Sequence, residues 1–117
     1  MRYLSLFTPD ERTAAEMSGP QHMEEMEKLV EEMSAAGVLI TRGAFLQRSL
    51  GARVRSSQGK LTVTDAPERE PNDRVVGFAI LDVKSKAEGI AMAKKFLKVA
   101  GDGECELRPL MAGPPEQ

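Results

Sequence analysis

The sequence predicts an α+β fold of the ferredoxin-like kind, a sandwich in which two helices cover one face of an antiparallel sheet and a β-hairpin is added. Segments follow in the order strand, helix, strand, hairpin, strand, helix, strand, which contains a split β-α-β unit. Each of the two longer helical segments has one apolar stripe and therefore one face to bury. A chain of 117 residues supports one hydrophobic core. We expect a single domain over residues 1–111 and a flexible Gly/Pro tail over residues 112–117.

The N-terminal segment is predicted to be a strand followed by a short helix. Residues 2–7, RYLSLF, alternate leucine with other side chains, as a strand with two usable faces does. Thr8, Pro9 and Glu11 fit a capping box with proline at the first helical position. They predict a helical turn that ends near Met17.

A longer acidic helix follows. Ser18 and Gln21 resemble a second capping box, and Gly37 is expected to end the helix. One stripe of this helix is apolar and contains Met23, Met26, Leu29, Val30 and Met33. At this spacing we favour core packing for the methionines over a ligand or partner groove.

The middle of the chain is predicted to be a strand, a hairpin and a loop. Residues 38–46 are β-branched and apolar, with Gly43 as a bulge or bend. The polar segments 53–55 and 60–64 are expected to pair around a Ser-Gln-Gly turn. Residues 65–73 contain two prolines and four acidic residues and are expected to form a loop.

The C-terminal part is predicted to hold the central strand, the second long helix and a last strand. Residues 75–83 are apolar on both faces, which is typical of a strand buried on both sides. Ser85 and Glu88 fit a capping box, and Gly101 ends the helix. Its apolar stripe is Ile90, Ala93, Leu97 and Ala100, widened by Met92, Phe96 and Val99. Residues 104–110 form the final strand.

The distribution of charge supports this arrangement and limits the partners. Residues 20–36 contain five acids and one lysine, and residues 85–99 contain four lysines and one acid, so adjacent helices would attract each other. Sixteen basic and eighteen acidic residues give a net charge of −2, which argues against nucleic-acid binding. The apolar stretches are far shorter than the roughly 20 residues that span a bilayer, so we expect no membrane association. The short apolar start before Pro9 does not fit a signal peptide, and we expect a cytoplasmic protein.

The expected sheet has more large apolar side chains than two helices can cover. In the first strand Tyr3 and Phe7 lie opposite Leu4 and Leu6, and in the central strand Phe78 and Ile80 lie opposite Ala79 and Leu81. A monomer rarely exposes several hundred Å² of contiguous apolar surface. We therefore expect a homodimer in which the sheets pack face to face.

Five segments resemble the YCII-related family and, within it, the DGPF-domain branch. They are RYLSLF, AAGVLITRGAFLQ, GARVRSSQGKLTVTDAPERE, VVGFAILDVKSKAEGIAMAKKF and ELRPL. The resemblance covers nearly the whole chain and implies a dimeric α+β barrel. Some relatives have been discussed as enzymes that use an Asp and a His in a cleft, and some occur beside sigma factors. Of the tetrapeptide that names the branch, Asp65 and Pro67 match, whereas Ala66 replaces glycine and Glu68 replaces phenylalanine.

Asp65 and His22 are the candidate catalytic pair. Asp65 follows a strand and can cap the turn, or it can point into a cleft and orient a histidine or accept a proton. His22 lies in the first turn of the acidic helix, where the dipole favours the neutral imidazole that accepts protons. The alternative for His22 is a partly buried stripe residue that shares a face with Met26 and Leu29.

Three arginines are candidates for binding an anion. Arg42 projects from a strand, and Arg53 and Arg55 lie on one side of the hairpin, where a carboxylate or phosphate can bridge them at the open edge of the sheet or the dimer seam. The alternative is surface charge that protects an edge strand from aggregation. The single cysteine, Cys105, is expected to be a small core residue, and one Cys with one His cannot form a structural zinc site. The sequence indicates no cofactor.

Two functions remain open from the sequence. The first is a homodimer that binds a small, anionic molecule, with acid/base catalysis as an extension. The second is a non-catalytic regulatory or protein-interaction module, associated with a sigma factor, that uses its acidic helix or the loop at residues 65–73.

Overall fold

The computed structural model describes all residues except 47, 66–73 and 112–117. It divides the chain into two compact units, the first formed by Met1–Ala44 with Val75–Gln117 and the second by Phe45–Arg74. The predicted tail, most of the predicted acidic loop, and Ala66, Pro67 and Glu68 of the altered tetrapeptide lie outside the described residues.

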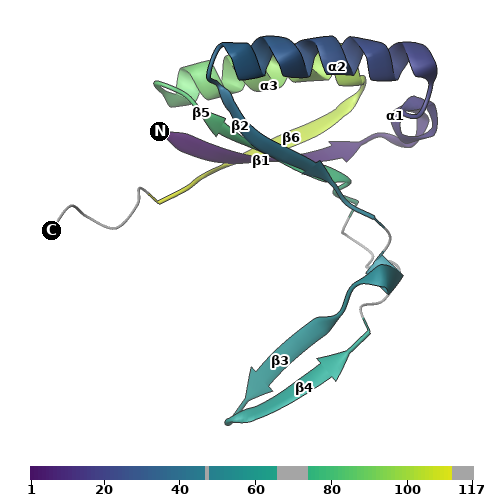
Figure 1. Ribbon diagram of the computed structural model, residues 1–117, viewed down its shortest axis with the longest axis vertical. Helices are drawn as coiled ribbons and strands as arrows, with labels where there is room; N and C mark the ends of the chain where they lie inside the picture. Colours follow the sequence, from purple (N-terminus) through teal and green to yellow (C-terminus); the bar gives the residue numbers. More distant parts are fainter. Residues whose placement is uncertain (47, 66–73, 112–117) are drawn as a thin grey trace, which may run out of the picture. The chain divides into compact units, whose positions relative to one another are not determined.

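The first unit is a four-stranded sheet covered by helices on one face (Figure 1). Its strands are β1 (Arg2–Pro9), β2 (Leu39–Ala44), β5 (Gly77–Asp82) and β6 (Gly103–Pro109), in the order β2-β5-β1-β6 and antiparallel throughout. The connection from β1 to β2 passes over β5, and that from β5 to β6 passes over β1. The predicted α+β class and ferredoxin-like topology are confirmed. Within the described residues, no helix is long and apolar enough to cross a membrane.

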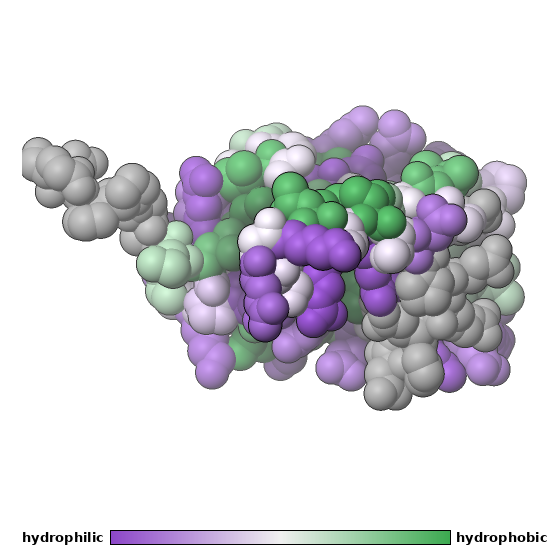
Figure 2. Space-filling model, turned by 90° about the horizontal axis from the view of Figure 1, so that it is seen from below, coloured by the Kyte–Doolittle hydropathy of each residue, from purple (hydrophilic) through white to green (hydrophobic). Residues whose placement is uncertain are grey.

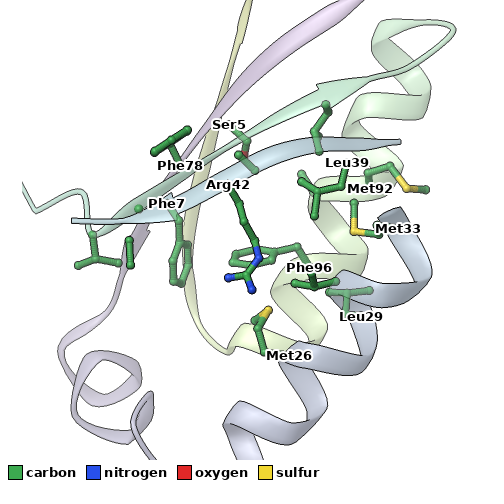
Figure 3. A pocket seen from close by; sticks show the side chains of 18 of the residues that line it. Ser5, Phe7, Met26, Leu29, Met33, Leu39, Arg42, Phe78, Met92 and Phe96 are labelled. Carbon is green, nitrogen blue, oxygen red and sulfur yellow. The ribbon is translucent and has the colours of Figure 1, made fainter. Parts of the chain in front are cut away.

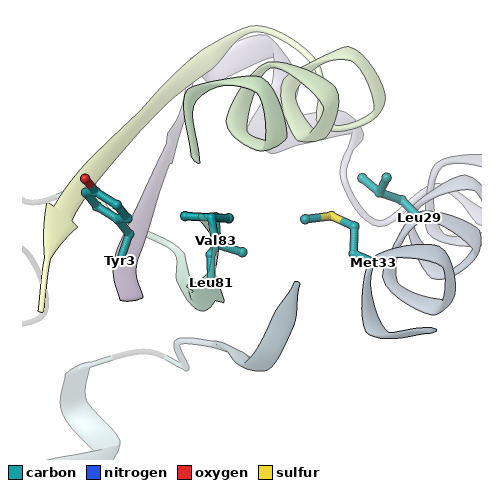
Figure 4. Packing of buried hydrophobic residues seen from close by; sticks show 5 residues of the cluster. All are labelled: Tyr3, Leu29, Met33, Leu81 and Val83. Carbon is teal, nitrogen blue, oxygen red and sulfur yellow. The ribbon is translucent and has the colours of Figure 1, made fainter. Parts of the chain in front are cut away.

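The hydrophobic core lies between the sheet and the two long helices, α2 (Pro20–Ala35) and α3 (Lys86–Ala100). Along β1 every second residue is buried, starting at Tyr3, which gives one covered face and one partly exposed face. The buried cluster consists of Tyr3, Leu29, Met33, Leu81 and Val83 (Figure 4). The alternation predicted for the first strand is therefore present, and Tyr3 and Phe7 are on its helix side.

The first predicted capping box is wrong. Thr8 and Pro9 belong to β1, where they pair with Glu104 and Gly103, and α1 (Glu11–Glu16) begins after Asp10 without a side-chain cap. The strand continues because β6 offers partners to these residues. Pairing of β1 with β5 stops at Phe7. A backbone N–H at position 9 would point toward β5 and find no acceptor there, so a proline, which has no N–H, is tolerated.

The second capping box is also wrong, although the helix itself is confirmed. Gly19 is the N-cap of α2, no side chain caps it, and Pro20 takes the first helical position, where a missing N–H is harmless. The helix stops before Gly37, which has φ +76°. Met23 is 58% exposed and does not belong to the buried stripe, which Leu29 and Met33 form with the partly buried Met26 and Val30.

Strand β2 has its irregularity at a different place from the one predicted. The register with β5 shifts between Leu39 and Thr41, not at Gly43. A Cβ atom on Gly43 would lie 2.6 Å from the Phe78 ring, so glycine is needed there because an aromatic side chain of the neighbouring strand crosses it.

Helix α3 begins with the predicted cap. The Ser85 hydroxyl accepts a hydrogen bond from the Glu88 backbone N–H at 3.2 Å, and the Glu88 carboxylate accepts one from the Lys84 N–H at 3.3 Å. Gly101 ends the helix with φ +107°. The side of the helix against the core differs in part from the predicted stripe, because Ile90 is exposed whereas the residues that pack against the cluster are Met92, Phe96 and Val99.

The two long helices attract each other as their charges predicted. Lys95 of α3 forms an ion pair with Glu32 of α2. Within α2, Lys28 and Glu24 lie 3.8 Å apart at i,i+4 spacing, where both side chains are largely exposed. The pairing between helices joins two segments that are far apart in the sequence, so it contributes to their relative placement on the sheet.

The second unit contains the predicted hairpin and a short 3₁₀ helix, η1 (Arg48–Leu50), that was not predicted. Strands β3 (Arg53–Ser57) and β4 (Lys60–Thr64) pair across a two-residue turn. Gln58 has φ 52° and Gly59 has φ 79°, the positive values that a tight hairpin turn of this length requires. Every residue of both strands is exposed.

The sheet face opposite the helices carries an apolar patch. Leu4 pairs with Ile80 and Leu6 pairs with Phe78, so the four side chains are adjacent on the two central strands. All four are partly exposed in the described chain. A space-filling view from below Figure 1 shows both hydrophobic and hydrophilic residues on the surface (Figure 2).

Candidate functional site

A pocket of about 180 Å³ lies between the sheet and helices α2 and α3, entirely within the first unit. Its lining comes from the helices, from the segment after α1 and from the strands. The helices contribute Met26, Leu29, Val30, Met33, Met92, Ala93 and Phe96, the segment after α1 contributes Met17, and the strands contribute Ser5, Phe7, Leu39, Arg42, Ala79 and Leu81 among others. The pocket is therefore an apolar space that continues from the hydrophobic core and has very few polar groups.

Arg42 is the one charged residue in this lining. It pairs with Ala79 across the sheet, and Ala79 pairs with Ser5, so all three side chains lie on the helix side. Its side chain extends from β2 into the pocket toward Met26 and Phe96 (Figure 3). No carboxylate among the described residues forms an ion pair with it. The predicted anion-binding role of Arg42 thus has a cavity to act in, on the helix side of the sheet.

Ser5 on β1 and Cys105 on β6 are polar residues on the helix side of the sheet. Ser5 lines the pocket and is buried, and its side chain is hydrogen-bonded to Cys105, which pairs with Phe7 across β1 and β6. Burial raises the pKa of the Cys105 thiol, the hydrogen bond from Ser5 opposes this, and the Glu104 carboxylate adds to it. The thiol stays protonated at neutral pH. Cys105 is partly buried and does not belong to the buried core cluster, so it is not the core residue that the sequence predicted.

His22 lies close to the pocket along α2 but is not part of its lining. It is in the first turn of the helix, as predicted, and it is partly exposed. Met26, one turn later on the same face, does line the pocket. His22 is thus placed one helical turn from the cavity.

The remaining predicted site residues belong to the second unit. Arg53 and Arg55 lie on β3 opposite Thr64 and Thr62, on the same face of the hairpin, and Asp65 directly follows β4. Whether Asp65 acts with His22, or Arg53 and Arg55 with Arg42, stays a prediction because the residues belong to different units. Across the described chain, no group of three or more His, Cys, Asp or Glu side chains is arranged to hold a metal ion.

The sequence predicted a ligand cleft near the sheet face or the dimer seam, but it did not place a pocket between the sheet and the helices. Met26 and Met33 were assigned to core packing, and they do pack in the core, but they also line the cavity. Ser5, Phe7 and Phe96 come from β1 and α3, which are separated by most of the chain. A serine among alternating leucines in RYLSLF is the one local signal, because a buried hydroxyl in an apolar strand usually has a partner.

The fold and the pocket together define a small α+β protein with a ligand-sized apolar cavity between its sheet and its helices. The chain belongs to the YCII-related domain family, whose match covers residues 1–112. No curated protein matches the sequence. Among solved structures, the chain is similar to 5-chloro-2-hydroxyhydroquinone dehydrochlorinase (TftG) from Burkholderia phenoliruptrix, in complex with 2,5-dihydroxybenzoquinone, with a TM-score of 0.50 and 13% identity over 97% of this chain and 96% of that chain. At this identity the likeness supports the shared fold.

Proposed function

We propose that this protein binds a small organic anion in the pocket between the sheet and helices α2 and α3, with Arg42 as the group that recognises the charge. The observation that carries the proposal is the Arg42 side chain, which enters an otherwise apolar cavity and has no acidic partner among the described residues. The Arg42 side chain is also exposed to solvent, so its guanidinium is accessible to a ligand, and a bound anion forms charge-assisted hydrogen bonds with it. A guanidinium also binds a carboxylate through two parallel hydrogen bonds.

The solved relative is consistent with this kind of ligand. TftG is a dehydrochlorinase whose structure contains 2,5-dihydroxybenzoquinone, a single ring with acidic hydroxyl groups. The cavity here, about 180 Å³, is of the size that accepts one ring, since an apolar cavity of about 150 Å³ binds benzene. Proteins of one fold host many activities, so this similarity supports the kind of ligand and not the reaction.

Acid/base catalysis is an extension of the proposal and has His22 as its first candidate. His22 is one turn from Met26 at the α2 side of the pocket, and its imidazole is partly exposed. The role of Asp65 beside His22 stays a prediction from the sequence, because the two residues belong to different units. If His22 acts in this way, His22→Gln should abolish turnover of a bound substrate while leaving its affinity within about threefold.

A second copy of the chain is the partner we propose for the helix-free face. The adjacent side chains of Leu4, Leu6, Phe78 and Ile80 are partly exposed there, and an identical apolar face is their simplest cover. The pocket lies on the other side of the sheet, so dimer formation would leave it open. The alternative of a regulatory module loses part of its basis, because Glu24 and Glu32 of the acidic helix are engaged with lysines of the same chain.

Binding of matched acids and amides tests the proposal. We expect calorimetry to detect benzoate and cyclohexanecarboxylate and to find benzamide and cyclohexanecarboxamide at least about tenfold weaker, because only the acids form charge-assisted hydrogen bonds. Arg42→Gln should remove that difference, and Arg42→Lys should keep part of it.

The control is Arg12→Gln, which removes an arginine from the exposed surface of α1, where it pairs with Glu16. It should leave both affinities unchanged. Equal affinity for acids and amides, or unchanged acid binding by Arg42→Gln, would show that Arg42 does not recognise an anion in this pocket.

A further inference from the structure

The methionines of this chain are divided between the pocket and the surface. Four of the seven, Met17, Met26, Met33 and Met92, line the cavity. The other three, Met1, Met23 and Met111, are exposed. Methionine side chains are flexible and polarisable, and their sulfur atoms make favourable contacts with the edges of aromatic rings. The four methionine side chains in the lining can therefore adapt to the shape of an aromatic ligand and contact its ring edges.

Two phenylalanines form a rigid corner of the same pocket. The rings of Phe7 on β1 and Phe96 on α3 have centroids 4.9 Å apart and are inclined at 84°, an edge-to-face pair. Phe7 is buried, so the pair is held by the core. Aromatic rings prefer offset or edge-to-face neighbours at such distances, and a third flat ring beside the pair gains the same geometry.

The described lining of the pocket has only two polar side chains, those of Arg42 and Ser5. Figure 3 shows the Arg42 guanidinium among Met26, Phe96 and Phe7, with Ser5 on the sheet behind it. A guanidinium is planar and binds a coplanar carboxylate or phenolate edge. The Ser5 hydroxyl, already bonded to Cys105, is the one neutral polar side chain in the lining. One acidic group at one end of an apolar ring satisfies this arrangement.

We propose that the ligand is a planar aromatic acid of a single six-membered ring, with the ring between the methionines and the Phe7–Phe96 corner and the anionic group on Arg42. This rests on the proposed function, since it names the class of anion that the same pocket selects. The cavity of about 180 Å³ leaves room for one ring with small substituents.

The methionines provide the test, because each ε-methyl group is a separate NMR probe. In protein labelled with [¹³C-methyl]methionine, benzoate should shift the signals of Met17, Met26, Met33 and Met92 through the ring current and leave Met1, Met23 and Met111 in place. Cyclohexanecarboxylate, with the same charge and a saturated ring, should bind about tenfold more weakly and produce much smaller shifts.

A pair of variants on one helix separates the thioether contribution from general packing. Met26→Leu conserves volume and should weaken benzoate about threefold while leaving cyclohexanecarboxylate unchanged. Met23→Leu, the matched change at an exposed position three residues earlier, should alter neither.

The outcomes distinguish this inference from the function on which it rests. Equal affinity for the two acids, both dependent on Arg42, overturns the aromatic class and leaves anion binding intact. Absence of binding by either acid overturns the proposed function and the inference with it. Benzoate shifts at the exposed methionines without shifts at the four pocket methionines overturn the location.

Discussion

At the scale of single residues, Cys105 shows how burial changes the chemistry of a side chain. Its thiol lies on the helix side of β6, and desolvation raises its pKa although the hydrogen bond from Ser5 opposes the effect. The folded protein thus holds the thiol proton more tightly than the unfolded chain does. The contribution of Cys105 to the free energy of unfolding is therefore fully present below the pKa of a thiol in the unfolded chain. It is lost as the pH rises through the higher pKa of the folded protein.

We expect the loss of stability between pH 8 and pH 10 to be smaller in Cys105→Ala than in the unmodified protein, measured by urea unfolding at both pH values. The comparison removes the effect of other groups that titrate in this range, because both proteins contain them. Ser5→Ala should make the thiol still slower to react with iodoacetamide, since the hydrogen bond that lowers its pKa is gone. Identical alkaline slopes for the first pair would contradict the role of burial.

At the scale of elements, the N-termini of the helices show which features depend on the local sequence and which depend on tertiary structure. Three capping boxes fit the sequence, and only the one at Ser85 forms. The other two failed for different reasons: Thr8 is held in a strand by pairing with β6, and Ser18 is displaced because Gly19 and Pro20 start α2. A capping pattern is therefore realised only where neither a competing strand nor a better start intervenes.

Two serine variants test this difference. Ser85→Ala should lower the free energy of unfolding by about 1 kcal/mol, because it removes the acceptor for the Glu88 N–H. Ser18→Ala, at the position where the sequence also predicted a cap, should change it by less than about 0.5 kcal/mol. Chemical denaturation measures both, and equal effects would show that the cap at Ser85 contributes nothing of its own.

At the scale of the whole molecule, the proposed dimer is tested on the helix-free face. We expect sedimentation velocity at micromolar concentration to show a dimer, and Leu6→Glu to shift it to a monomer because it places a charge in the centre of the apolar patch. Circular dichroism should confirm that the variant stays folded. Gln21→Glu adds the same charge at an exposed position of α2 and should stay dimeric. A monomeric parent protein would rule out the proposed pairing.

The sequence determined which segments are strands and helices, because periodicity, glycine and proline act over a few residues. The two helices, the central strand at 75–83 and the Gly59 hairpin are all present near their predicted limits. It also determined that Tyr3 and Phe7 lie opposite Leu4 and Leu6, because side chains alternate along a strand. The α3 stripe was partly misplaced, since Ile90 and Phe96 are both apolar and only packing selects between them.

Only the tertiary structure decided where the pocket is and which charged group enters it. Arg42, Arg53 and Arg55 are equivalent as sequence, yet the structure places Arg42 alone in the lining of a cavity. That cavity requires Phe7, Met26 and Phe96 to meet from three elements, and local patterns contain no information on such long-range contacts. The physical reason is that a side chain's neighbours depend on how the elements pack, whereas its own conformation depends on the residues beside it.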